Sequence, residues 1–150
     1  MRVYFAHPKF NEKQVAFATG FIEQLTRLQN EEGEQTVHVL DPFDYSPNIE
    51  GDREKVKQLA KTVLDANHRL IQASDLIIAV IDDRDIGVIY EVGYAVAHSI
   101  PVITISAQNY DVNIMLSASV LAHFPNVMEE AQLNQLLEVL SSQAALVGLG

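Results

Sequence analysis

Residues 76–95 read LIIAVIDDRDIGVIYEVGYA, and this stretch decides the expected fold. The run 76–81 is short and wholly apolar, which is typical of a strand buried on both faces of a parallel sheet. Residues 88–99 have a helical pattern, so the stretch contains a strand-to-helix crossover. Glu91 then lies near the carboxyl edge of the sheet, beside a helix start, where open α/β folds bind ligands. We therefore expect an α/β fold in which Glu91 is a candidate nucleophile.

Extended and helical segments alternate along the rest of the chain. The expected strands cover residues 3–6, 37–40, 76–81 and 101–105, and the expected helices follow Asn11 and cover 53–73, 88–99, 113–123 and 129–142. Strands separated by helices of this length imply a parallel sheet with right-handed crossovers. Within residues 53–73 we expect the apolar side chains to point inward, namely Val56, Leu59, Ala60, Val63, Leu64, Leu70 and Ile71. Residues 41–48 are rich in turn formers and are expected to form a loop able to cover a pocket.

Composition limits the class of protein. The chain has 150 residues, 48% of them hydrophobic, so we expect one domain over residues 1–150 with a sizeable core. No apolar run approaches the ~20 residues of a membrane span, and we expect a cytoplasmic protein with no membrane partner. The absence of cysteine excludes disulfides, thiolate nucleophiles and Cys-ligated metals. A formal charge of -10 argues against a nucleic-acid polymer as partner, because that binding depends on basic residues.

Several familiar chemistries have no motif in this chain. It contains neither a GxxxxGK[ST] phosphate loop nor a GxGxxG fingerprint, and no serine lies in a GxSxG elbow. The five histidines match no metal-binding spacing, so we expect neither a metal nor a cofactor. A receiver-type signalling domain shares the order of elements but needs an acidic pair after the first strand, where this chain has Ala6-His7-Pro8.

Four segments together resemble the nucleoside 2-deoxyribosyltransferase family. They are residues 4–8 (YFAHP), 73–80 (ASDLIIAV), 85–95 (DIGVIYEVGYA) and 101–103 (PVI), and the resemblance spans about residues 3–115. The resemblance implies a flavodoxin-like, three-layer fold with a parallel sheet of about five strands flanked by helices. It also implies transfer of a 2-deoxyribosyl group from one nucleobase to another through a covalent glycosyl-enzyme.

The chemistry of Glu91 agrees with that implication. Cleavage of an N-glycosidic bond passes through an oxocarbenium-like state, and a carboxylate opposite the leaving base can capture C1′ as an ester. A second base then displaces the carboxylate with overall retention. We expect Glu91 in the first turn of its helix, where the helix dipole favours the ionised form by roughly 0.3–1 kcal/mol. The alternative interpretation is an ordinary first-turn helix acid.

The resemblance assigns roles to further residues. Asp85, six positions before Glu91, matches the acid that binds the sugar hydroxyls, and Gly87 belongs to the same motif. Tyr4 matches the tyrosine that orients the nucleophilic carboxylate. Asn113 and Met115 match a segment that closes the sugar pocket, often in a neighbouring subunit. Helix capping by Asp85 or Asn113 and core packing of Tyr4 are the simpler alternatives.

Two positions depart from the family pattern. The family has an acid eight positions before Asp75, where it exchanges a proton with the base, and this chain has Asn67. An amide is not a general acid. Asn67 can still bind a base by hydrogen bonds, and proton transfer then passes to Asp41, Asp44, His7 or water. His7 stands where a small residue is usual, and it lies at the pocket mouth or points to solvent.

Three functions follow as hypotheses. The first is a transferase whose partners are deoxynucleosides and free nucleobases and which forms a homodimer or a hexamer. The second is a hydrolase of deoxynucleosides or their 5′-monophosphates, in which water discharges the glycosyl-enzyme. The monophosphate version is disfavoured because related hydrolases have serine at position 85, whereas the carboxylate of Asp85 repels phosphate. The third is a non-catalytic module that senses nucleosides or nucleotides.

Overall fold

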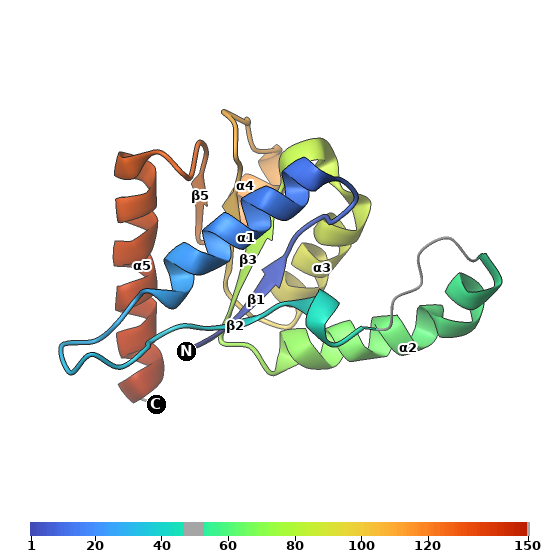
Figure 1. Ribbon diagram of the computed structural model, residues 1–150, viewed down its shortest axis with the longest axis horizontal. Helices are drawn as coiled ribbons and strands as arrows, with labels where there is room; N and C mark the ends of the chain where they lie inside the picture. The colour runs from blue at the N-terminus through green and yellow to red at the C-terminus, as the bar shows by residue number, and fades with distance from the viewer. Residues whose placement is uncertain (47–52, 150) are drawn as a thin grey trace.

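The computed structural model describes residues 1–46 and 53–149 (Figure 1). Within these residues five parallel strands form a sheet with the order β2-β1-β3-β4-β5. The strands are β1 (Arg2–Ala6), β2 (His38–Leu40), β3 (Leu76–Val80), β4 (Val102–Ile105) and β5 (Ala122–Phe124). This is the flavodoxin-like order, in which ligands bind beyond the carboxyl ends of β1 and β3. The expected fold class is confirmed.

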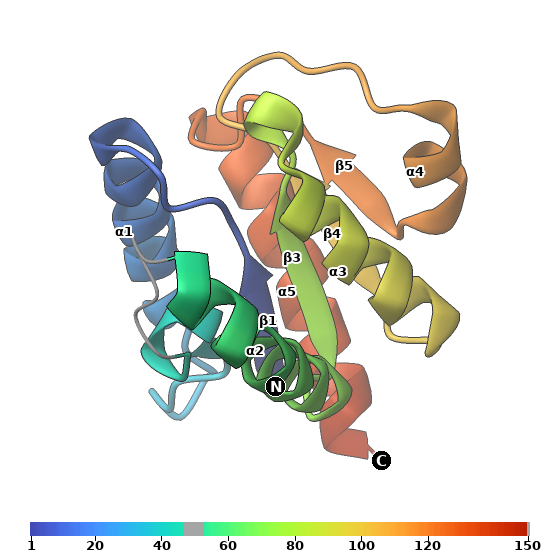
Figure 2. The ribbon, with the colours of Figure 1, turned by 90° about the vertical axis from the view of Figure 1, so that its right-hand side faces the viewer.

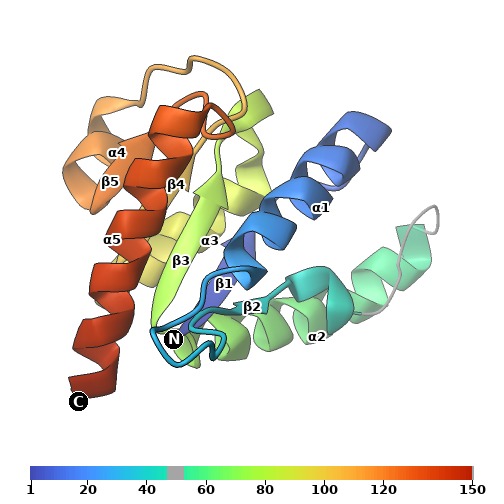
Figure 3. The same cartoon turned by 60° about the vertical axis from the view of Figure 1, so that its left-hand side comes forward.

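Helices cover both faces of the sheet. Helices α1 (Glu12–Thr26) and α5 (Glu130–Leu149) lie on one face, in front of the sheet in Figure 3. Helices α2 (Arg53–Gln72) and α3 (Ile86–Ala97) lie on the other face, as Figure 2 shows. Alternate residues of a strand point to opposite faces, so Val3 and Phe5 join the core under α1 and α5. Tyr4 and Ala6 join the second core under α2 and α3.

Helix α3 begins earlier than the sequence pattern indicated. The Asp85 carboxylate accepts a hydrogen bond of 2.8 Å from the Val88 amide, and this cap places the first helical residue at Ile86. Glu91 therefore lies in the second turn of α3, and the expectation of a first-turn position was wrong. The dipole argument for its ionisation is lost with that position, because the effect is confined to the first turn. The cap of α1 by Asn11 is confirmed, since Asn11 accepts from the Gln14 amide.

The segment expected as one helix over residues 113–123 contains two elements. Helix α4 (Ile114–Ser119) is short, and the chain then enters strand β5. β5 pairs with β4 in parallel, with Thr104 opposite His123, and their side chains are 2.9 Å apart at Oγ1 and Nδ1. The prediction was wrong because three residues of strand carry almost no periodicity, and pairing with a buried neighbour overrides local preference.

Helix α2 buries less than its pattern predicted. Ile71 is its buried apolar residue, whereas Val56 and Leu64 are exposed. The reason is visible in Figure 1, where the N-terminal half of α2 extends beyond the sheet. Among the described residues, no helix is both long and apolar enough to cross a membrane. After β2 the short helix η1 (Pro42–Asp44) is capped by Asp41, while Pro47 and Asn48 of the predicted loop lie outside the described residues.

Candidate active site

Tyr4 and Glu91 form the centre of the site. Tyr4 lies in the middle of β1 and is fully buried, and its hydroxyl donates a hydrogen bond to Oε2 of the Glu91 carboxylate. One side chain comes from the sheet and the other from α3, so the bond joins two layers of the fold. The bond also holds the carboxylate in one orientation, and among the described residues the second oxygen of Glu91 has no hydrogen-bond partner.

Burial is the main influence on the ionisation of this pair. Desolvation raises the pKa of Glu91 to about 7, with a further increase from the charge of Asp85. The hydrogen bond from Tyr4 and the charge of His7 act in the opposite direction. Burial and the neighbouring Glu91 charge raise the pKa of Tyr4 far above its ordinary value, so Tyr4 stays a donor. A carboxyl group that titrates near neutral pH is a frequent feature of catalytic sites.

Asp85 is the N-cap of α3, and Gly87 in the first turn lines the groove beside Glu91, whereas Asp85 does not line it. One oxygen of Asp85 caps the helix at the Val88 amide. A Cβ atom at Gly87 would lie 3.1 Å from Oδ1 of Asp85, so a larger residue would displace that carboxylate. The charge of Asp85 also acts on Glu91. The helix-cap interpretation of Asp85 is therefore correct, and the cap uses one of the two oxygens of the carboxylate.

The turn before Asp85 has an unusual backbone. Asp83 and Arg84 in helix η2 (Asp82–Arg84) have φ angles of 61° and 51°, a left-handed conformation that non-glycine residues seldom adopt. Two sets of hydrogen bonds hold the turn. Asp82 accepts from the amides of Ala107 and Gln108 at 2.7 and 3.4 Å, and Asp83 accepts from the side chain of Gln14 at 3.0 Å. Residual strain of this kind is common beside functional sites.

Asn67 lies in the same groove as Glu91. The groove runs between α2 and α3 and includes Asn67, His68, Gly87, Tyr90 and Glu91 in its lining. The Ser46 hydroxyl donates to Oδ1 of Asn67 at 3.3 Å, so this contact uses the acceptor of the amide and not its nitrogen. Within the described residues that nitrogen has no hydrogen-bond partner. The structure thus brings Asn67 and Glu91 together in one groove.

His7 is buried at the end of β1, which excludes the interpretation that it points to solvent. Its Nε2 lies 3.1 Å from Oδ1 of Asp41. Burial opposes ionisation of Asp41, yet the hydrogen bond and charge of His7 lower the pKa of that carboxyl overall. His7 and Asp41 are therefore brought together, and their charges act on Glu91 and Tyr4 respectively.

Asn113 and Met115 lie on α4, apart from these groups. The Asn113 carboxamide accepts from the Met115 amide at 2.8 Å, which is an ordinary helix cap. Neither residue lines the groove around Glu91. Ile114 is 80% exposed and Met115 is 73% exposed, so both apolar side chains face outward.

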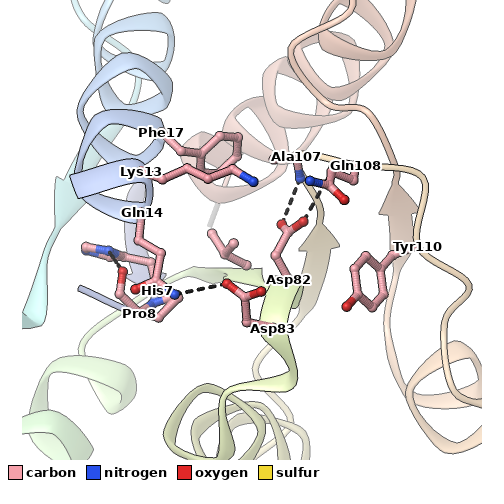
Figure 4. Close-up of a pocket in the computed structure, with 11 residues that line it drawn as sticks. His7, Pro8, Lys13, Gln14, Phe17, Asp82, Asp83, Ala107, Gln108 and Tyr110 are labelled. Carbon is pink, nitrogen blue, oxygen red and sulfur yellow. Dashed lines mark hydrogen bonds between the residues drawn. The ribbon is translucent and has the colours of Figure 1, made fainter. Parts of the chain in front are cut away.

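A second pocket lies across the sheet from the groove (Figure 4). It includes His7, Lys13, Asp82, Asp83 and Tyr110 in its lining, and Phe17 of α1 forms part of its apolar wall. Glu91 is not part of it. We place the chemistry in the groove because the oriented carboxylate is there. Among residues 1–46 and 53–149, no cluster of three His, Asp or Glu side chains could hold a metal ion.

Sequence reasoning missed three residues near the site. His68 and Tyr90 line the groove, and the His68 Nε2 atom lies 3.0 Å from the Tyr90 hydroxyl. Ser46 orients the amide of Asn67. His68 and Tyr90 are sequence neighbours of Asn67 and Glu91, and this was the available signal. Ser46 had no such signal in the sequence, because its contact with Asn67 joins the segment after η1 to α2.

The fold and the site define an α/β protein with a half-buried, tyrosine-oriented glutamate at the sheet's carboxyl edge. The model of the nucleoside 2-deoxyribosyltransferase family matches residues 3–136, and the chain belongs to that family. The family resemblance read from the sequence is therefore confirmed. No curated protein sequence matches the chain.

Solved structures of similar fold include two with described activities. A 2-deoxyribosyltransferase from Bacillus psychrosaccharolyticus is 25% identical with a TM-score of 0.64, covering 89% of this chain and 96% of its own. A conserved protein from Enterococcus faecalis V583 is 23% identical with a TM-score of 0.58, over 95% and 98% of the chains. A CMP N-glycosidase of Clostridium botulinum is 18% identical with a TM-score of 0.56, over 90% and 98%. The latter two show the fold alone.

Proposed function

We propose that this protein is a nucleoside 2-deoxyribosyltransferase which moves 2-deoxyribose between nucleobases through a covalent ester on Glu91. The observation that carries the proposal is the Glu91 carboxylate held by the Tyr4 hydroxyl at the ligand-binding edge of the sheet. Membership of the family supports the same reaction class.

The reaction has two displacements at C1′. In the first, the free oxygen of Glu91 bonds to C1′ while the C1′–N bond breaks, and the base leaves with the electron pair and takes up a proton. In the second, a nitrogen of another base bonds to C1′ and gives up its proton to water, while the C1′–O bond breaks and the ester oxygen departs as carboxylate. Tyr4 orients Glu91 throughout. Two inversions give overall retention.

Substrate-binding roles are distributed around Glu91. Asp85 binds the sugar hydroxyls through the oxygen that does not cap α3, and Gly87 leaves room for the sugar. Asn67 binds the base through its amide nitrogen. Proton transfer to the base passes through water, because Asn67 is not an acid and the pKa of Asp41 is lowered.

A neighbouring subunit completes the sugar pocket in this proposal. The outward-facing Ile114 and Met115 supply an apolar contact surface, and Asn113 lies at its edge. A homodimer, or a hexamer of dimers, would bring these residues to the groove of another copy.

Product analysis by HPLC tests the proposal. Deoxyadenosine or deoxyinosine with a different free base should yield the exchanged deoxynucleoside, whereas the ribonucleoside should react poorly. The 2′-hydroxyl destabilises the oxocarbenium-like state inductively and must also fit the pocket. Free deoxyribose as the main product at millimolar acceptor base would replace the transferase by the hydrolase. Binding without either product would indicate the sensing module.

A further inference from the structure

His7 is held in one orientation by its packing. It is 6% exposed and follows directly after β1. Its ring stacks on Phe5 with centroids 4.6 Å apart and meets the edge of Phe43 at 5.0 Å. Rotation of the imidazole would break both contacts, so the two ring nitrogens have fixed partners.

Both of those partners accept hydrogen bonds. Nδ1 of His7 lies 3.2 Å from the carbonyl oxygen of Pro8, and Nε2 lies 3.1 Å from Oδ1 of Asp41. A carbonyl oxygen only accepts, and so does an ionised carboxylate. Asp41 also accepts from the Phe43 amide at 3.0 Å, which favours its ionised form. A neutral imidazole has one N–H group and satisfies one of these acceptors, whereas imidazolium satisfies both.

We propose that His7 is a buried imidazolium that serves as the fixed positive charge of the site, holding Asp41 ionised and oriented and stabilising the negative charge of Glu91. His7 acts through these two carboxylates, so it is a positioning residue rather than a group that contacts substrate. This inference about His7 depends on the proposed transferase function only in taking Glu91 as the nucleophile.

The surrounding charges agree with a cation at this position. Asp41 faces His7 from the end of β2, and Glu91 is within its electrostatic influence. On the α1 side, Lys13 and the carboxylates of Asp82 and Asp83 line the same pocket as His7 (Figure 4). Lys9 also acts on Asp41 and lies over the Phe43 ring. The acids Asp41, Asp82, Asp83 and Glu91 still outnumber Lys9 and Lys13, so a positive charge on His7 reduces the net negative charge at this edge.

The proposal also connects the two departures from the family pattern. Asn67 brings neither a charge nor an acidic proton to the base side of the groove. Asp41, kept ionised by His7, supplies a carboxylate at the end of β2, where its charge acts on Tyr4. Pairing with His7 also lowers the free-energy cost of burying this carboxylate.

Nitrogen NMR on protein labelled in its histidine rings tests the protonation state directly, without substrate or turnover. At about pH 7.5 both ring nitrogens of His7 should carry a proton, and the His7→Gln spectrum identifies the signals. One unprotonated ring nitrogen would overturn the proposal. In Asp41→Asn the charged acceptor is gone, so His7 should lose one of its two protons under the same conditions.

Carbon NMR of the Glu91 carboxyl tests the electrostatic role. In His7→Gln the titration midpoint of Glu91 should rise by roughly half a unit to two units, because a nearby opposite charge is removed. His98→Gln is the matched control. His98 caps the C-terminal end of α3, two turns after Glu91, and its Nδ1 lies 2.8 Å from the Tyr94 carbonyl oxygen. An unchanged midpoint in folded His7→Gln would contradict the role. If neither exchange nor hydrolysis is found, the proposed function fails while both NMR results still decide this proposal.

Discussion

The Tyr4 hydroxyl donates its hydrogen bond to Glu91 across 87 positions of the chain, from the central part of the sheet to the helix after β3. Both groups are taken out of water to make this contact, which raises the pKa of each. A pair of this kind costs folding stability, and its value lies in an oriented carboxylate that titrates near neutral pH. Four predictions follow from the pair and its neighbours.

Replacing the nucleophile should abolish turnover without harming the fold. Glu91→Gln removes the oxygen that bonds C1′, so base exchange should fall by several orders of magnitude. Glu130→Gln, an exposed acid in the first turn of α5, is the control and should retain activity. Mass spectrometry after trapping with a slow substrate should find the adduct on the peptide that contains Glu91. Turnover retained in Glu91→Gln would refute the covalent role.

The same substitution should stabilise the protein at high pH. The pKa of Glu91 is about 7 in the folded protein against an ordinary value of 4.5. Between these values the folded state holds a proton that the unfolded chain releases, so stability falls as pH rises through this window. Glu91→Gln removes that loss, which is about 3 kcal/mol above neutral pH. Urea unfolding should show Glu91→Gln more stable near pH 8 and equal to wild type near pH 4; equal stability at both would contradict the raised pKa.

Removing the orienting hydroxyl should shift the pH profile. In Tyr4→Phe the hydrogen bond that lowers the pKa of Glu91 is lost, so that pKa should rise above about 7. The acidic limb of kcat/KM should then move to higher pH, and activity near pH 6 should fall more than activity near pH 8.5. Tyr110→Phe, in the pocket across the sheet, should leave the limb in place. A uniform loss at all pH values would indicate that Tyr4 only packs.

An acid at position 67 should accelerate the reaction if protonation of the leaving base limits it. Asn67→Asp places a carboxyl group in the groove beside Glu91, and general acid catalysis is typically worth roughly 10²–10⁴-fold when the geometry is right. Asn67→Ala is the control, because it removes the amide without supplying a proton. If single-turnover rates are equal or lower in Asn67→Asp, another group already donates the proton.

The exposed surface of α4 predicts an oligomer. Wild type should be a dimer or hexamer by light scattering at micromolar concentration, and the double substitution Ile114→Ser with Met115→Ser should dissociate it and lower activity together. Leu146→Ser changes an exposed apolar residue of α5 and should do neither. A fully active wild-type monomer would mean that Asn113 and Met115 have only a local role.

Much of the fold was predictable because its strongest signals are local. The apolar run of β3 and the helical spacing around it are enough to indicate a parallel sheet, and the structure agrees. The end of α4 was not predictable, since β5 is three residues long and exists through its pairing with β4. The exposure of Val56 was also not predictable, because helical spacing does not reveal whether the sheet lies beneath the first turns of α2.

The sequence by itself determined the α/β order, the family, and the set of residues from which a site could be built. Tertiary structure alone decided how those residues meet: that Tyr4 bonds Glu91, that Glu91 is in the second turn with its pKa raised, and that His7 is buried against Asp41. The physical reason is that periodicity records which side of an element faces the core. Desolvation, hydrogen-bond partners and charge pairs instead depend on distances between segments that are far apart in the chain.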